Sequence, residues 1–119
     1  SPATSAWAYI SGNWYLFNER GYMVTGWTNV DGSWYFMNTS GAMHYGWLAD
    51  ERGEWYYMNP VSDGTRGAMR TGWRHIDGKW YYLNPVSDGS LGRMFKNQRT
   101  PDGYLLRADG SWDESAGKK

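Results

Sequence analysis

The 119-residue chain contains no cysteine, which excludes a disulfide framework and a thiolate metal site. Isoleucine, valine and leucine together number only 12, too few for an ordinary aliphatic core. The 12 basic and 12 acidic residues balance, so there is no excess positive charge to attract nucleic acid or an anionic membrane. No apolar run approaches the length of a transmembrane helix. We therefore expect no nucleic-acid partner and no membrane insertion.

Aromatic residues are abundant where aliphatic ones are scarce. The chain has 9 tryptophans, 10 tyrosines and 3 phenylalanines, and each ring can bury roughly 150–250 Å². Its 16 glycines suit many tight turns. The composition favours an all-β domain whose core is built from aromatic rings.

Residues 72–84 show the basic unit most clearly. Two short aromatic and β-branched runs flank an Asp-Gly pair, which predicts a β-hairpin with a two-residue turn. In that register His75 faces Trp80 and Trp73 faces Tyr82. Because side chains alternate along a strand, we expect these four residues to share one face of the hairpin.

This unit recurs along the chain. The first tryptophans of successive units are 20, 20 and 26 residues apart. An N-terminal segment covers residues 1–5, and a degenerate capping hairpin with a tail covers residues 98–119. Between them the four repeats cover residues 6–25, 26–45, 46–71 and 72–97.

Two irregularities interrupt the period. The third repeat has one extra residue, and a three-residue loop at 51–53 with Gly53 in a left-handed conformation would keep Trp47 opposite Tyr57. Insertions at 60–66 and 85–91 follow the third and fourth hairpins. We expect both insertions on the outside of the fold, where they disturb stacking least.

The C-terminal segment departs furthest from the pattern. Residues 109–112 repeat the sequence of residues 31–34, which predicts another hairpin turn, but the strand before them has no leading tryptophan. Terminal repeats are atypical because one of their faces has no neighbour. A single hairpin is marginally stable in water, so the hairpins are expected to stack. The predicted fold class is an all-β solenoid of stacked β-hairpins.

The pattern Gly-Trp, then Trp-Tyr-Tyr-Leu-Asn, then Gly-x-Met resembles the cell-wall-binding repeat of the choline-binding proteins of Gram-positive bacteria and their phages. The resemblance covers residues 6–97 in four copies. It implies a hairpin solenoid with ligand sites between consecutive hairpins, each using two tryptophans of one repeat and an aromatic residue of the next. Methionine often lines the wall of such a site. The implied ligand is the choline or phosphocholine group of teichoic acids.

Carried onto this chain, the resemblance implies three complete aromatic sites and a fourth pair. A quaternary ammonium has no N–H to donate and is attracted to the negative faces of aromatic rings, so such cages suit it. Trp73 and Trp80 have no matching third aromatic residue, and Tyr104 is the nearest candidate. Met43 and Met69 are candidate wall residues, although packing is the role that their residue type favours. The complete sites are Trp7, Trp14 and Phe36; Trp27, Trp34 and Tyr57; and Trp47, Trp55 and Tyr82.

The sequence offers no catalytic constellation. Its two histidines, His44 and His75, fall in different contexts, one in a connection and one in a strand. Most aspartates precede glycine, a sequence that favours tight turns. No two carboxylates are placed as a pair for general acid–base catalysis. We therefore expect no catalytic residues, no metal site and no cofactor.

The sequence predicts a non-catalytic module that anchors an exported, surface-associated protein to phosphocholine-bearing teichoic acid. Residues 1–10 lack the features of a signal peptide, so the signal of an exported parent would lie upstream. Two alternatives stay open: a glucan-binding repeat module and a structural stalk for protein interaction. A glucan-binding site would need more hydrogen-bonding side chains beside its rings than Asn29 and His75 provide. Whether choline also promotes a dimer through an end unit is left open.

Overall fold

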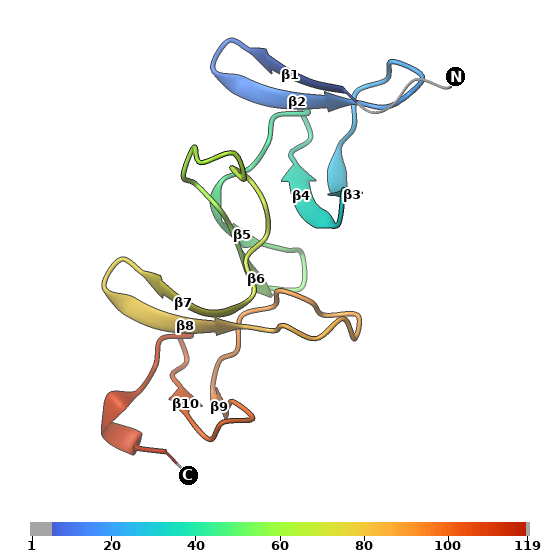
Figure 1. Cartoon of the computed structure of the whole chain (residues 1–119). Helices are drawn as coiled ribbons and strands as arrows, with labels where there is room; N and C mark the ends of the chain where they lie inside the picture. Colours follow the sequence, from blue (N-terminus) through green and yellow to red (C-terminus); the bar gives the residue numbers. More distant parts are fainter. Residues whose placement is uncertain (1–5, 119) are drawn as a thin grey trace. The chain divides into compact units, whose positions relative to one another are not determined.

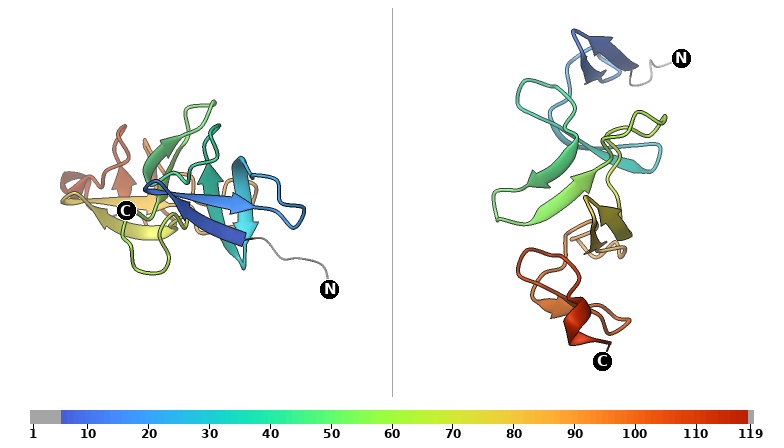
Figure 2. Two further views of the ribbon diagram at one scale, coloured as in Figure 1. Left: turned by 90° about the horizontal axis from the view of Figure 1, so that it is seen from above. Right: turned by 90° about the vertical axis from the view of Figure 1, so that its left-hand side faces the viewer.

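The structure is a computed structural model, and it describes residues 6–118. These residues form five antiparallel hairpins and one short 3₁₀ helix, and no sheet among them contains more than two strands (Figures 1 and 2). The elements are β1 (Ala6–Ile10), β2 (Asn13–Phe17), β3 (Gly26–Val30), β4 (Ser33–Met37), β5 (Gly46–Ala49), β6 (Trp55–Met58), β7 (Gly72–Ile76), β8 (Lys79–Leu83), β9 (Gln98–Arg99), β10 (Leu105–Leu106) and η1 (Glu114–Ala116). The predicted all-β class built of hairpins is confirmed.

The chain divides into two compact units. Among the described residues, the first unit comprises 6–46 and Met58–Met69, and the second comprises Trp47–Tyr57 and 70–118. In the first unit Leu16, Met37 and Met43 form a buried cluster. The partly buried rings of Trp7, Trp14, Tyr35 and Tyr45 pack against this cluster, together with Val24 and Val30. In the second unit Leu83 and Leu106 are fully buried.

The hairpin turns follow the prediction. In the β7–β8 hairpin His75 pairs with Trp80 and Trp73 with Tyr82, as the Asp-Gly register requires. Asp77 and Gly78 have φ values of 51° and 82°. Positive φ at both central residues defines a type I′ turn, whose twist matches that of the strands. Asp tolerates this conformation and Gly adopts it without steric cost.

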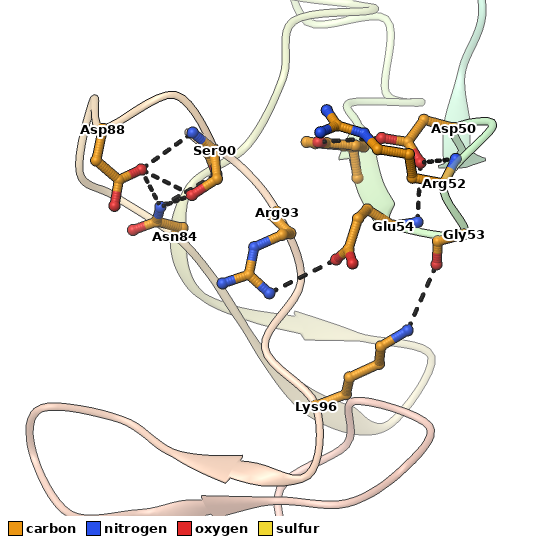
Figure 3. Close-up of polar contacts among 10 residues, drawn as sticks. Asp50, Arg52, Gly53, Glu54, Asn84, Asp88, Ser90, Arg93 and Lys96 are labelled. Atoms are coloured by element: carbon orange, nitrogen blue, oxygen red, sulfur yellow. Dashed lines mark hydrogen bonds and ion pairs between the residues drawn. The ribbon is translucent and has the colours of Figure 1, made fainter.

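The extra residue between β5 and β6 is absorbed by a three-residue loop, as predicted. Asp50 N–H donates to Glu54 O at 2.9 Å, and Gly53 has a φ of 80°. The Asp50 carboxylate accepts two further bonds from the loop backbone, at Arg52 N and Glu54 N (Figure 3). The loop preserves the register, because the rings of Trp47 and Tyr57 lie 5.0 Å apart.

Backbone hydrogen bonds join each hairpin to the connection that follows the next one. In the first unit Met43 N–H donates to Trp14 O and Met69 N–H to Trp34 O, both at 2.8 Å. In the second unit Met94 N–H donates to Trp55 O at 2.7 Å and Trp112 N–H to Trp80 O at 2.8 Å. The four equivalent bonds show that stacking involves the backbone as well as the aromatic side chains.

The C-terminal segment is a shortened fifth repeat, and the turn at residues 109–112 lies in its connection, where Leu106 and Trp112 form an antiparallel bridge. The hairpin of this repeat is β9–β10, which ends before Arg107. Arg107 N–H donates to Ser111 O, and Gly110 N–H donates to Arg107 O, as in the turn of the connection that follows β4. Trp112 therefore occupies the position of the connection methionines. The two copies of the Asp-Gly-Ser-Trp sequence form different turns: Asp31 and Gly32 both have positive φ, whereas at residues 109–110 only Gly110 does.

Candidate functional site

One aromatic cavity lies in the first unit and is called the Tyr35 cavity. Trp7 on β1 and Trp14 on β2 meet edge to face, with ring centroids 6.5 Å apart and planes at 88°. Tyr35 on β4 lies 5.0 Å from Trp7 at 65°. These three rings and Met43 line a cavity of about 220 Å³. The rings thus form three steeply inclined walls.

The structure places Tyr35, and not the predicted Phe36, in this cavity. Phe36 pairs with Trp27 across its own hairpin, and their ring centroids are 5.2 Å apart. Adjacent residues of a strand point to opposite faces, so Tyr35 faces away from Trp27. The prediction treated one face of the hairpin as the source of all three rings, whereas the third ring comes from the opposite face of the next hairpin.

A second cavity of the same design lies in the second unit and is called the Tyr81 cavity. Trp47 and Trp55 are 6.4 Å apart at 83°, and Tyr81 lies 4.9 Å from Trp47 at 69°. These values nearly repeat those of the Tyr35 cavity. Met94 completes the apolar lining of a space of about 430 Å³. Both cavities therefore use one geometric rule.

Tyr82 and Tyr57 do not occupy the predicted positions. Tyr82 is 9% exposed and packs against Trp73 of its own hairpin at 5.1 Å. Tyr57 likewise packs against Trp47 of its own hairpin at 5.0 Å. Burial raises the pKa of both phenols, so they stay neutral under physiological conditions. Both side chains are structural members of their own hairpin.

A third cavity lies at the C-terminal end of the second unit and is called the Tyr104 cavity. Trp73, Trp80, Tyr104 and Trp112 line about 310 Å³. Tyr104 is 5.8 Å from Trp73 and 6.0 Å from Trp112, at 85° and 87°. Tyr104, the nearest candidate named from the sequence, therefore lines this cavity, and Trp112 forms a further wall. Trp112 was missed because its turn was assigned to the wrong part of the repeat.

The remaining predicted residues are Trp27, Trp34 and Met69. Trp27 and Trp34 project from β3 and β4 of the first unit and are 38% and 37% exposed. Tyr57, predicted to join them, belongs to the second unit. Met69 forms an antiparallel β-bridge with Met58, and its backbone N–H donates to Trp34 O. A ligand site at these residues stays a prediction.

The first insertion lies on the outside of the fold, as predicted, since residues 60–65 are exposed, but part of it also borders the site. Ser62, Gly64 and Arg66 line the Tyr35 cavity together with its rings. Asn59, only 4% exposed, holds the loop by donating to Asp63 Oδ1 and to Thr65 Oγ1. An insertion that looked like a surface excursion therefore forms a wall of the cavity.

The electrostatic surroundings of the two similar cavities differ. Asp109 and Lys96 line the Tyr81 cavity, whereas Arg66 is the charged residue lining the Tyr35 cavity. Hydrogen bonds from the Ser111 hydroxyl and backbone N–H hold the pKa of Asp109 below its usual range, with Lys79 and Arg107 adding to the effect. Burial, then the Asp109 and Asp77 charges, raise the pKa of Tyr81. The Tyr81 cavity thus presents a neutral phenol and an ionised carboxylate.

Neither metal ligands nor a membrane-spanning helix is found in the part of the chain that the structure describes. Residues 6–118 contain no group of three or more histidine, aspartate or glutamate side chains that could hold a metal ion. Within the same residues, no helix is long and apolar enough to cross a membrane. The His75 ring lies 4.9 Å from Trp80, tilted at 43°, and the His44 ring lies 6.4 Å from Phe36.

Comparison with known families identifies the repeat. A family model described as a choline-binding repeat matches residues 3–36 and 24–65, which together exceed half of the chain. The chain belongs to the choline-binding repeat family. A second model, described as a putative cell wall binding repeat, matches residues 71–85. No curated protein sequence matches the chain.

Solved structures of choline-binding proteins share the fold. Choline binding protein F from Streptococcus pneumoniae matches 93% of this chain at 40% identity with a TM-score of 0.77. The choline binding domain of Spr1274 in the same organism matches 76% of the chain at 38% identity with a TM-score of 0.61, and 95% of that domain is covered. The chain spans 34% of choline binding protein F, about a third of its length.

An enzyme is also among the relatives. The modular autolysin LytC from Streptococcus pneumoniae matches 93% of this chain at 30% identity with a TM-score of 0.65, and 23% of LytC is covered. The matching family models describe binding repeats and not a catalytic domain. This chain is therefore a choline-binding repeat module.

Proposed function

We propose that this module anchors an exported protein to the bacterial cell wall by holding choline groups of teichoic acids in its aromatic cavities. The observation that carries the proposal is the recurrence of one arrangement, two tryptophans near a right angle with a tyrosine beside them, in the Tyr35 and Tyr81 cavities. Three inclined π faces suit a trimethylammonium group, which offers no N–H for hydrogen bonding. The module itself has no catalytic role.

The relatives support this ligand chemistry. Choline binding protein F has been solved in complex with ipratropium, a quaternary ammonium compound, and in the presence of a peptidoglycan analogue. A sugar-binding site would instead need side chains able to bond hydroxyl groups beside the rings. The Tyr104 cavity is lined by four aromatic residues alone, which favours a cation over a sugar.

The energetics require several sites. Each cation–π contact is worth about 0.5–2 kcal/mol, so one cavity should bind choline with a Kd near the millimolar range, about −4 kcal/mol. Wall polymers carry many choline groups, and engaging two or three cavities together can raise the apparent affinity by roughly 10²–10⁴-fold. Anchoring is therefore a property of the repeated cavities and not of one site.

Titration with choline and with a soluble glucan, followed by tryptophan fluorescence, tests the proposal. We expect choline to change the emission with a midpoint near the millimolar range and glucan to leave it unchanged. A response to glucan alone would identify a carbohydrate-binding module. A response to neither would leave only a structural stalk and would refute the proposal.

A further inference from the structure

We propose that the Tyr35 cavity is selective for the phosphocholine group over free choline and that Arg66 contacts the phosphate. The inference rests on the proposed choline binding and adds a ligand preference that distinguishes this cavity from the Tyr81 cavity. It starts from an electrostatic conflict: the charged residue that lines this cation-binding cavity is itself a cation.

A guanidinium beside a choline cavity weakens the binding of free choline, because like charges repel. The Tyr81 cavity differs, because the Asp109 carboxylate lines it together with the Lys96 cation, so its charges balance. In phosphocholine the phosphate follows the ammonium after a two-carbon link, so it would lie beside the cage and not within it. An arginine at the wall matches this zwitterion, because guanidinium groups bind phosphate oxygens through charge-assisted hydrogen bonds.

Arg66 is held in place by stacking, and no ion pair joins it to an acidic side chain among the described residues 6–118. Its guanidinium carbon lies 4.0 Å from the ring centroid of Tyr45, and Tyr45 packs against the buried cluster that supports the cavity rings. Arg66 Nε is buried, and no hydrogen-bond acceptor among residues 6–118 satisfies it. A buried donor without a partner costs stability, so intramolecular hydrogen bonding at Nε does not explain why an arginine stands here.

The loop that carries Arg66 has a natural counterpart with a different residue. In both insertions an asparagine Nδ2 donates to a hydroxyl at 2.9 Å, from Asn59 to Thr65 and from Asn84 to Ser90. Leu91 stands in the second loop where Arg66 stands in the first. The loop conformation is therefore compatible with leucine at this position, so we expect Arg66→Leu to remove the charge and preserve the loop.

The test uses ¹⁵N-labelled protein and follows the indole N–H signals of Trp7 and Trp14 during separate titrations with choline and with phosphocholine. Single Trp→Phe variants assign the signals. Those of Trp47 and Trp55 report the Tyr81 cavity as an internal reference. Arg20→Leu removes an exposed arginine of the same unit that does not line the cavity, and serves as the charge-matched control.

In the unaltered protein we expect phosphocholine to bind the Tyr35 cavity roughly 5–10-fold more tightly than choline, the gain of one charge-assisted contact. In Arg66→Leu the two affinities should move in opposite directions: phosphocholine weakens and choline binds slightly better. A purely structural role would weaken both together. Arg66→Lys should retain part of the preference, and Arg20→Leu all of it.

Equal binding of both ligands at Trp7 and Trp14 in the unaltered protein, or parallel losses in Arg66→Leu, would overturn the inference while leaving choline binding intact. No response of any indole to either ligand would instead refute the proposed function.

Co-sedimentation with phosphatidylcholine vesicles and with choline-bearing teichoic acid identifies the source of the phosphocholine group. Binding to the polymer alone is expected, and binding to vesicles would place the source in a lipid headgroup.

Discussion

At the residue scale, alternation along a strand decides which rings form a cavity and which form the core. The strands β4, β6 and β8 each carry two adjacent aromatic residues after their tryptophan. Tyr82 faces Trp73 of its own hairpin, while its neighbour Tyr81 faces Trp47 of the preceding one. The structure brings together two of the tryptophan pairs named from the sequence, Trp7 with Trp14 and Trp47 with Trp55, because the hairpin register fixes them. The sequence could not tell which neighbouring tyrosine would complete a cavity, because both are aromatic and both faces are partly buried.

This division of roles predicts different effects for two adjacent substitutions. Tyr81→Ala should remove one choline site with a modest loss of stability, since its ring is half-buried. Tyr82→Ala should destabilise the protein by about 3–5 kcal/mol, because its ring is 9% exposed in the core. Urea unfolding together with calorimetric stoichiometry separates the two outcomes. The reverse pattern would mean that the cavity ring is Tyr82.

A glycine in the connection of the third repeat makes a second residue-scale prediction. Gly67 has a φ of 88°, and a Cβ placed there would overlap the sulfur of buried Met43. Gly21 has a φ of 84° but no atom within 4 Å of its Cβ position. Both alanine substitutions incur backbone strain, and only Gly67→Ala adds overpacking.

We therefore expect Gly67→Ala to lower the free energy of unfolding by about 1–3 kcal/mol more than Gly21→Ala does. Urea denaturation of the two variants in parallel gives this difference directly. Equal losses would show that methionine packing over glycine does not contribute to the stacking.

At the scale of the element, the connection after each hairpin matters as much as the hairpin. Its methionine position donates a backbone hydrogen bond to the preceding hairpin, as Met43 does to Trp14. Such backbone contacts leave no residue-type signature beyond Gly-x-Met, so the sequence did not reveal them. For the same reason the sequence did not reveal that the insertion carrying Arg66 contributes to the Tyr35 cavity.

The turn around Asp109 predicts a pH dependence. The pKa of Asp109 lies below its usual range, chiefly because Ser111 donates two hydrogen bonds to the carboxylate. The folded state therefore favours the ionised form. Its stabilising contribution is present above roughly pH 4, the ordinary aspartate pKa, and is lost as the pH falls through the lowered value.

Asp109→Asn should flatten the decline in stability between about pH 5 and pH 2. Thermal unfolding at a series of pH values measures the slope. Glu19→Gln, an exposed substitution in the other unit, serves as the control and should leave the slope nearly unchanged. An unaltered slope in Asp109→Asn would show that this carboxylate does not link folding to pH.

At the scale of the whole molecule, repetition gives both stability and function. The hairpins and their tight turns followed from the sequence, because aromatic alternation and Asp-Gly pairs recur at a regular spacing. The Tyr104 cavity was harder to foresee. Arg99 pairs with Leu105 in the shortened last repeat, so the position of the leading tryptophan is held by an arginine and the repeat is hard to recognise. Tyr104 in this repeat nevertheless contacts the leading tryptophan of the preceding repeat, as Tyr35 and Tyr81 do.

A crystal structure of the protein grown with choline tests the central claim most directly. We predict a trimethylammonium group between the rings of the Tyr35, Tyr81 and Tyr104 cavities, in contact with the tryptophan faces. Choline bound elsewhere on the surface, or these cavities closed by their own side chains at saturating choline, would contradict the account.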